Sequence, residues 1–150
     1  MALDIDTILD AVVSHAAASG YFERVNAHEP KAAPGGGLTC AVWMDSLSGA
    51  PSGLASTSAL VTLKLRLYTN MIMEPADAID PNLTRACSAL IGAYAADFTL
   101  GGAVRCVDLR GSAGTPLRAQ AGYLSQDGRL YRVMDITLPL IVNDVWDEAP

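Results

Sequence analysis

The longest alternating stretch of the chain runs from Leu130 to Trp146 (LYRVMDITLPLIVNDVW). Its even positions from 134 to 142 are all apolar, whereas its odd positions change from mixed to apolar. Alternation with many β-branched residues predicts a strand. We expect this strand to begin half-buried and to end buried on both faces, and a second subunit is the simplest source of the missing cover. Pro139 has no N–H to donate, so it predicts an edge or a bulge in the strand.

Two other segments, residues 5–16 and 83–98, carry apolar residues at helical spacing. Acidic residues stand at or just before the start of both segments, where they can cap a helix and complement its dipole. The expected start signals are Asp4 or Asp6 for the first helix, and Asp80 followed by Pro81 for the second. The expected stop signals are Gly20 and the pair Gly101-Gly102.

Further alternating or apolar runs predict strands at residues 21–26, 38–44, 58–70, 104–109 and 117–124, in addition to the strand already expected, whose regular part is 130–142. The run 58–70 is the clearest: Val61, Leu63, Leu65 and Leu67 share one face, and Thr62, Lys64, Arg66 and Tyr68 share the other. Gln126-Asp127-Gly128 predicts a hairpin turn. Residues rich in Gly, Pro, Ser and Ala predict long flexible loops at 27–37, 45–56 and 110–116. Together these elements predict one α+β domain over residues 1–150, with a mainly antiparallel sheet and two helices on one of its faces.

The composition is more apolar than that of an average soluble domain, with 51% hydrophobic and 17% charged residues. Oligomer contacts are the preferred explanation, and a generous core is the alternative. No run resembles a membrane span, and the acidic start MALDIDTILD lacks the basic region of a signal peptide. We therefore expect a soluble chain, cytoplasmic at synthesis, with no membrane partner.

Candidate chemistry is sparse. Cys40, Cys87 and Cys106 form no close pair, which argues against a disulfide framework and a zinc site. The glycine run at 35–37 lacks the lysine and hydroxyl residue of a phosphate-binding loop. His15 and His28 have no catalytic motif around them, and no serine stands in a Gly-x-Ser-x-Gly context. We expect no catalytic residue, no metal and no cofactor. The net charge of −6, without a cationic cluster, argues against a surface that grips nucleic acid.

Four segments, in this order, resemble the tail terminator proteins of long-tailed phages: GYFERVNAHEPKAAPGGGLTCAVW, LRLYTNMIMEPADAIDPNL, YAADFTLGGAVRCVDLRG and AGYLSQDGRLYRVMDITLPLIVNDVW. The resemblance is one of overall pattern and extends over nearly the whole chain. It implies an α+β fold and a non-catalytic ring, a homohexamer, at the tail–neck junction of the virion. Such a ring caps the finished tail tube, stops its growth and offers a surface to the filled head.

The partners that this resemblance implies are further copies of the chain, the tail tube protein and a head-completion or connector protein. DNA would pass through the channel without specific binding. The candidate contact residues are Tyr68, Met73, Arg110, Arg118, Leu138, Leu140 and Trp146. The candidate channel-lining acids are Asp77, Asp80 and Asp144, for which helix capping and solubility are the plainer reading. Two alternatives stay open: a head-completion or connector-adaptor protein of the neck, and a small-molecule-binding α+β domain.

Overall fold

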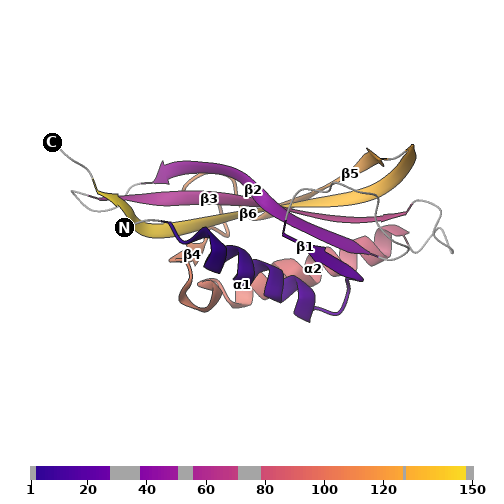
Figure 1. The fold of residues 1–150 in the computed structure, drawn as a ribbon, viewed down its shortest axis with the longest axis horizontal. Coiled ribbons are helices and arrows are strands. Elements are labelled where there is room, and N and C mark those ends of the chain that lie inside the picture. Colours follow the sequence, from indigo (N-terminus) through magenta and orange to yellow (C-terminus); the bar gives the residue numbers. More distant parts are fainter. Residues whose placement is uncertain (1–2, 28–37, 51–55, 71–78, 127, 148–150) are drawn as a thin grey trace.

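The computed structural model describes residues 3–27, 38–50, 56–70, 79–126 and 128–147. In chain order its elements are α1 (Ile5–Ala18), β1 (Arg24–Asn26), β2 (Thr39–Ala50), β3 (Ser56–Asn70), α2 (Ile79–Ala96), the short 3-10 helix η2 (Leu100–Gly102), β4 (Cys106–Val107), β5 (Arg118–Gln126) and β6 (Arg129–Asp147). Both α-helices lie on the same side of one curled sheet (Figure 1). The predicted α+β fold, mainly antiparallel with two helices on one face, is confirmed.

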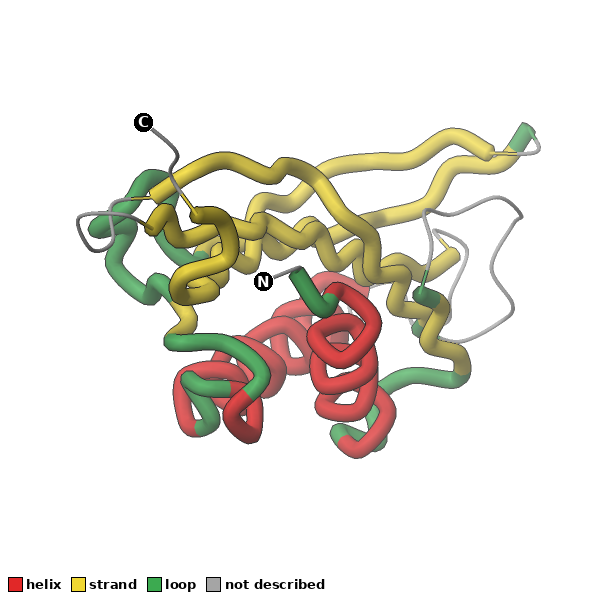
Figure 2. The backbone as a smooth tube through the Cα atoms, turned by 60° about the vertical axis from the view of Figure 1, so that its left-hand side comes forward, coloured by secondary structure: helices red, strands yellow, loops and turns green. Residues whose placement is uncertain are grey.

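The last strand, β6, lies at the centre of the six-stranded sheet. Along one side β6 pairs with β3, from Tyr131 to Asp147. Along the other side it pairs first with β5 and then with β4, all of them antiparallel. β2 pairs with β3, and β1 adds a short parallel pair at the far edge. The β5–β6 hairpin curls away from the helical layer (Figure 2).

Pro139 lies in this central strand, so the predicted edge position is wrong. On the β3 side it stands opposite Thr62 without a shift of register there. On the other side β5 ends its pairing at Thr137 and β4 begins at Leu140. The Pro139 carbonyl oxygen accepts a hydrogen bond from the Asp108 N–H on that side (2.9 Å). Because the N and O of one strand residue point the same way, the missing N–H falls in the gap between β5 and β4, where no ladder bond is lost.

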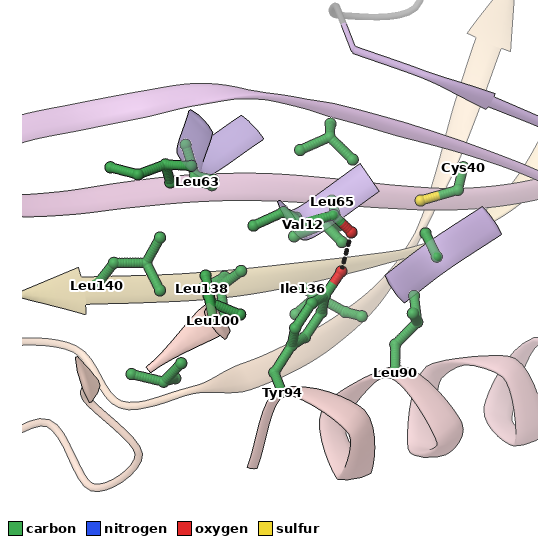
Figure 3. Close-up of a cluster of buried hydrophobic side chains, with 14 of the residues drawn as sticks. Val12, Cys40, Leu63, Leu65, Leu90, Tyr94, Leu100, Ile136, Leu138 and Leu140 are labelled. Carbon is green, nitrogen blue, oxygen red and sulfur yellow. Dashed lines mark hydrogen bonds between the residues drawn. The ribbon is translucent and has the colours of Figure 1, made fainter. Parts of the chain in front are cut away.

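The main core lies between the sheet and the two helices, as Figure 3 shows. From β3 and β6 it takes the alternating residues that the sequence assigned to one face, all fully buried: Val61, Leu63, Leu65, Leu67, Ile136, Leu138 and Leu140. The helices add the stripes Ile8, Val12, Ala16 and Leu83, Ala86, Cys87, Leu90, Tyr94. Burying each of the larger side chains contributes about 1.5–3 kcal/mol. The Tyr94 hydroxyl donates to the Val12 carbonyl oxygen (2.9 Å), which satisfies the one polar group of the tyrosine and joins the helices.

The far end of β6 is more open than expected. Ile141 and Val142 are half-buried and Trp146 is 39% exposed, so burial on both faces is not observed in the chain alone. The register between β3 and β6 shifts between Thr57 and Ala59, which face Trp146 and Val142. The β3–β6 pairing has no such shift at Pro139, so the bulge predicted there is wrong as well.

Several boundaries differ from the prediction. The segment 45–50 was expected to be a loop, but it continues β2 after a register shift between Met44 and Ser46. Its backbone is paired with β3 while its side chains are small, polar or exposed, so the sequence carries no apolar alternation there. Helix α2 begins at Ile79, which places Asp80 in its first turn and not at its cap. Of the strand expected at 104–109, only β4 forms. The expected loop 27–37 lies outside the described residues, apart from position 27.

Candidate functional site

The side of the sheet opposite the helices, here called the outer face, carries side chains from β2, β3, β5 and β6. In the part of the chain that the structure describes, no helix covers it (Figure 2). The loop between β4 and β5 reaches over one end, where a Cβ on Gly114 would lie 3.4 Å from Leu60 Cδ2. An uncovered face with both apolar and charged side chains is a candidate contact surface.

One half of the outer face is an apolar cluster of Ala41, Tyr68 and Val133, against which Trp43 and Leu124 pack. Tyr68 is only 2% exposed, and burial is the main cause that raises the pKa of its hydroxyl. Tyr68 was expected to contact a partner. Instead it is buried in this cluster, whereas Trp43 and Leu124 at its border are only half-buried.

Next to this cluster, Arg66 forms a two-pronged ion pair with Asp135, with N–O distances of 2.8 and 3.0 Å. The guanidinium carbon also lies 5.3 Å from the centre of the Trp43 ring, within cation–π distance. The planar guanidinium suits both contacts at once. Arg66 therefore links β2, β3 and β6 across the outer face.

The other half of the outer face is a polar groove of about 410 Å³. It is lined by Asp45, Ser46, Thr62, Lys64, Thr115, Arg118, Gln120, Asp135 and Thr137. Lys64 donates to the Thr137 hydroxyl (3.3 Å), and Arg118 donates to the Gln120 side chain (3.0 Å). Neither cation forms an ion pair with any residue that the structure describes. Since Asp135 is already neutralised by Arg66, the groove offers two cations against the single carboxylate of Asp45.

The β5–β6 hairpin presents two large exposed apolar side chains, Tyr123 (62%) and Leu130 (49%). Arg132 stacks on the Tyr123 ring at 4.6 Å and pairs with Asp80 of α2 at 3.0 Å. It also donates to the Gly122 carbonyl oxygen (3.2 Å). Asp80, proposed from the sequence as a channel-lining acid, thus ties the start of α2 to the hairpin while 67% of its side chain stays exposed.

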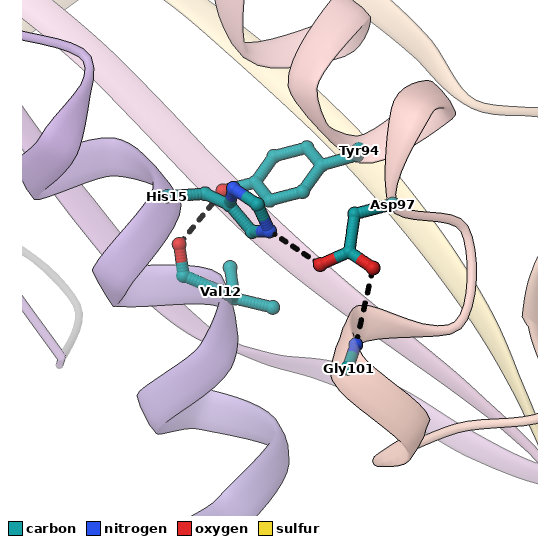
Figure 4. A network of polar contacts seen from close by, with 5 residues as sticks. All are labelled: Val12, His15, Tyr94, Asp97 and Gly101. Atoms are coloured by element: carbon teal, nitrogen blue, oxygen red, sulfur yellow. Dashed lines mark hydrogen bonds and ion pairs between the residues drawn. The ribbon is translucent and has the colours of Figure 1, made fainter.

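A second polar contact links α1 to the end of α2 (Figure 4). His15 Nε2 lies 2.9 Å from Asp97 Oδ2, and the His15 ring meets the Tyr94 ring edge-on. The Gly101 N–H donates to the other carboxylate oxygen (3.1 Å). The hydrogen bond with His15, followed by that from Gly101, holds the pKa of Asp97 below its ordinary value. A histidine–carboxylate pair can orient a catalytic base. Within the described ranges, however, no serine or cysteine is hydrogen-bonded to His15, and the pair acts as a contact between α1 and the end of α2.

The loop that carries Arg110 is held by Asp108, which is 3% exposed. The Asp108 carboxylate accepts hydrogen bonds from the N–H and hydroxyl of Ser112, both at 2.8 Å, and from the Ala113 N–H at 2.9 Å. Burial raises the pKa of Asp108, but the hydrogen bonds from Ala113 and Ser112 outweigh it and hold the pKa below its ordinary value. The segment 110–116, expected to be a flexible loop, is instead hydrogen-bonded to a buried carboxylate.

The remaining contact residues predicted from the sequence are widely separated. Leu138 and Leu140 are fully buried under the helices, so the expectation that they contact a neighbour is corrected: their even positions place them on the core face. Arg110 is exposed in the loop, Arg118 lines the groove, and Trp146 lies near the end of β6. Met73 and Asp77 lie outside the described residues. So does the side chain of Asp144, although its backbone belongs to β6.

Sequence reasoning offered Trp43 as a possible interface residue but did not connect it with Lys64 and the Arg66–Asp135 pair in one surface. The alternation of residues 61–68 did place Lys64 and Arg66 together on a polar face. Their partners Thr137 and Asp135 come from β6, and only the register between β3 and β6 brings them opposite. That register has no local signal in the sequence.

Among the described residues, no group of three or more His, Cys, Asp or Glu side chains is placed to hold a metal ion. The described helices include none that is long and apolar enough to cross a membrane. A scan against protein-family models gives no match, and a search of curated proteins also finds no significant relative.

Proposed function

We propose that this chain is a structural virion protein that assembles into a ring, caps the tail tube of a long-tailed phage and provides the joining surface for the head. In this proposal the chain acts by assembly and not by catalysis. Its partners are further copies of itself, the tail tube protein and a head-completion or connector protein, and it is located at the tail–neck junction.

The observation that carries the proposal is the outer face of the sheet, which presents Trp43, Lys64 and Arg118 without a covering helix in the described part of the chain. The helices cover only the other face of the sheet, so this face, with its mixture of apolar and charged side chains, is free to pack against a neighbouring subunit. The exposed side chains Tyr123, Leu130 and Trp146 add apolar area at the hairpin and at the end of β6. The resemblance of four ordered segments to tail terminator proteins points to the same kind of assembly.

The candidate channel-lining acids remain part of the proposal, but with a smaller role for Asp80. Asp80 keeps a partly exposed carboxylate beside Arg132, so its charge is largely compensated. A compensated acidic surface would let DNA pass without a strong field of either sign. Asp77 and Asp144 keep their proposed role from the sequence alone.

Negative-stain electron microscopy of the protein alone, and mixed with purified tail tubes, tests this function. We expect toroids, or caps at tube ends, and tubes of defined length when the protein is added during polymerisation. A matched sample with a tube-binding-incompetent protein of similar size and charge controls for non-specific sticking. Tubes that grow unchanged in its presence and carry no cap would contradict the proposal.

The same mixtures distinguish the neck-protein alternative from the proposed function, because a head-completion or connector-adaptor protein would bind filled heads and leave tube length unchanged.

The polar groove of about 410 Å³ favours the small-molecule alternative, since it falls within the size range of ligand sites. Its lining is polar, whereas ligand pockets are mostly apolar. A melting temperature that rises with one ligand class, together with the mass of a monomer or dimer, would support that alternative.

A further inference from the structure

Charge is unevenly distributed over the two sides of the molecule. Helix α1 carries Asp6 and Asp10, is preceded by its cap Asp4, and contains no lysine or arginine. The polar groove on the outer face instead holds Lys64 and Arg118, which form no ion pair within the described residues. In a chain of net charge −6, a groove with excess positive charge is a local reversal of sign.

The exposed side of α1 carries short side chains. Asp6, Asp10, Ser14 and Ala17 follow each other at spacings of four, four and three residues and are all exposed. At 100° per residue they form one stripe, opposite the stripe of Ile8, Val12 and Ala16 that faces the sheet. Acidic residues fill its first half and small residues its second half, so another surface can approach the helix closely.

These two surfaces lie on opposite sides of one subunit. Helix α1 lies on the helical side of the sheet (Figure 1), whereas the side chains that line the groove belong to the outer face. A contact between them joins different patches on the two copies and is therefore heterologous. Heterologous contacts form a ring when the rotation between copies closes. Such a contact also gives the outer face of the sheet a helical cover.

We propose that the acidic stripe of α1 in one copy docks into the polar groove of the next copy, with Asp6 and Asp10 facing Lys64 and Arg118. The occupant of the groove is thus a second copy of this chain. The inference rests on the self-assembly part of the proposed function and specifies which faces meet.

Two charge-reversed double variants test the contact: Asp6→Lys with Asp10→Lys, and Lys64→Glu with Arg118→Glu. Mass photometry and analytical ultracentrifugation measure the assembly of each variant, and circular dichroism with a melting curve verifies its fold. We expect assembly of either variant alone to weaken by about tenfold or more, because like charges then face each other. Mixing the two variants should restore assembly as alternating rings, since every contact then joins opposite charges. The variant Arg85→Glu with Arg105→Glu, which reverses exposed cations elsewhere, should assemble like the wild type.

Failure of the docking and failure of the proposed function give different results. If wild-type rings cap tubes but both reversed variants assemble normally, the docking is wrong and the proposed function stands. If the wild type assembles and the mixture restores assembly but tubes are never capped, the docking stands and the proposed function fails. A wild type that stays monomeric both alone and with tubes contradicts both. Loss of binding to duplex DNA in the groove variant, with assembly intact, would assign the groove to phosphates and overturn the docking.

Discussion

Arg66 of β3 and Asp135 of β6 stand directly opposite each other, and their side chains meet in a two-pronged ion pair. They are 69 residues apart in the chain. A shift of one residue in the β3–β6 register would place one of them on the core face. The pair therefore also reports whether the two central strands are correctly aligned.

Replacing Arg66 with Lys should destabilise the fold by about 1 kcal/mol, because an ammonium group keeps the charge but loses the second hydrogen bond and the stacking on Trp43. Urea unfolding of Arg66→Lys, Asp135→Asn and the double variant gives the coupling energy. We expect the double variant to lose less than the sum of the single losses. Strict additivity would show that the two side chains act independently.

Gly111 should tolerate alanine poorly. Its φ is +75°, and an added Cβ would lie 2.6 Å from the Gly114 carbonyl oxygen and 2.8 Å from the Pro116 nitrogen. Gly128 has the same φ of +75° but no atom within 4 Å of an added Cβ, which makes it a matched control. We expect Gly128→Ala to cost about 1 kcal/mol, the cost of the left-handed backbone, and Gly111→Ala clearly more. Equal losses in thermal unfolding would show that the loop moves to accept the methyl group.

Acid should weaken the protein partly through Asp108. A carboxyl whose folded pKa lies below its ordinary value of about 3.9 stabilises the fold above that value, and this contribution disappears as the pH falls through the folded pKa. Asp97, whose pKa is also lowered, adds to the same slope. Unfolding free energies measured between about pH 2 and pH 6 should rise with pH in the wild type and rise less steeply in Asp108→Asn. An unchanged slope in this variant would exclude Asp108 as a source of the acid sensitivity.

Alanine variants of Trp146 and Leu138 should separate effects on assembly from effects on folding. Leu138 is fully buried in the core, so Leu138→Ala should cost about 2–5 kcal/mol of stability. Trp146 is 39% exposed near the end of β6, so Trp146→Ala should weaken assembly more than it lowers the melting temperature. Melting curves and ring mass measured on both variants test this contrast. A large drop in melting temperature with normal assembly would make Trp146 a core residue.

The three thiols should differ in reactivity. Cys40 is fully buried, and burial raises its pKa to about 12, so little thiolate exists at neutral pH. Cys87 is 5% exposed, whereas Cys106 is partly open at the short strand β4. Iodoacetamide labelling followed by mass spectrometry should modify Cys106 first and Cys40 only after unfolding. Early labelling of Cys40 would reveal local opening of the β2–β3 pair.

The elements with regular periodicity were predictable from the sequence, because burial on one face imposes it. Val61 to Leu67 alternate since only one side of β3 meets the helices, and Ile8, Val12 and Ala16 are spaced for the same reason. The continuation of β2 through Ser46 to Ala50 was not predictable, since backbone pairing with β3 holds it and leaves its side chains small or exposed.

The candidate site was predictable only in part. Arg118 and Trp146 are exposed, and their proposed contacts stay a prediction. Tyr68 is buried in a cluster with Ala41 and Val133 from other strands, and that cluster has no local signal in the sequence. The groove depends on side chains from β2, β3, β5 and β6, which only the completed sheet assembles.

The central position of β6 has a consequence during synthesis. The chain leaves the ribosome with α1, β2, β3 and α2 ahead of residues 129–147, the strand that β3, β4 and β5 all need. Until those residues emerge, β3 has only β2 beside it in the sheet, so the backbone N–H and C=O groups along its other edge are open to chaperones or to another nascent chain. A chain truncated before residue 129 would therefore be a substrate for proteases and not a smaller folded domain.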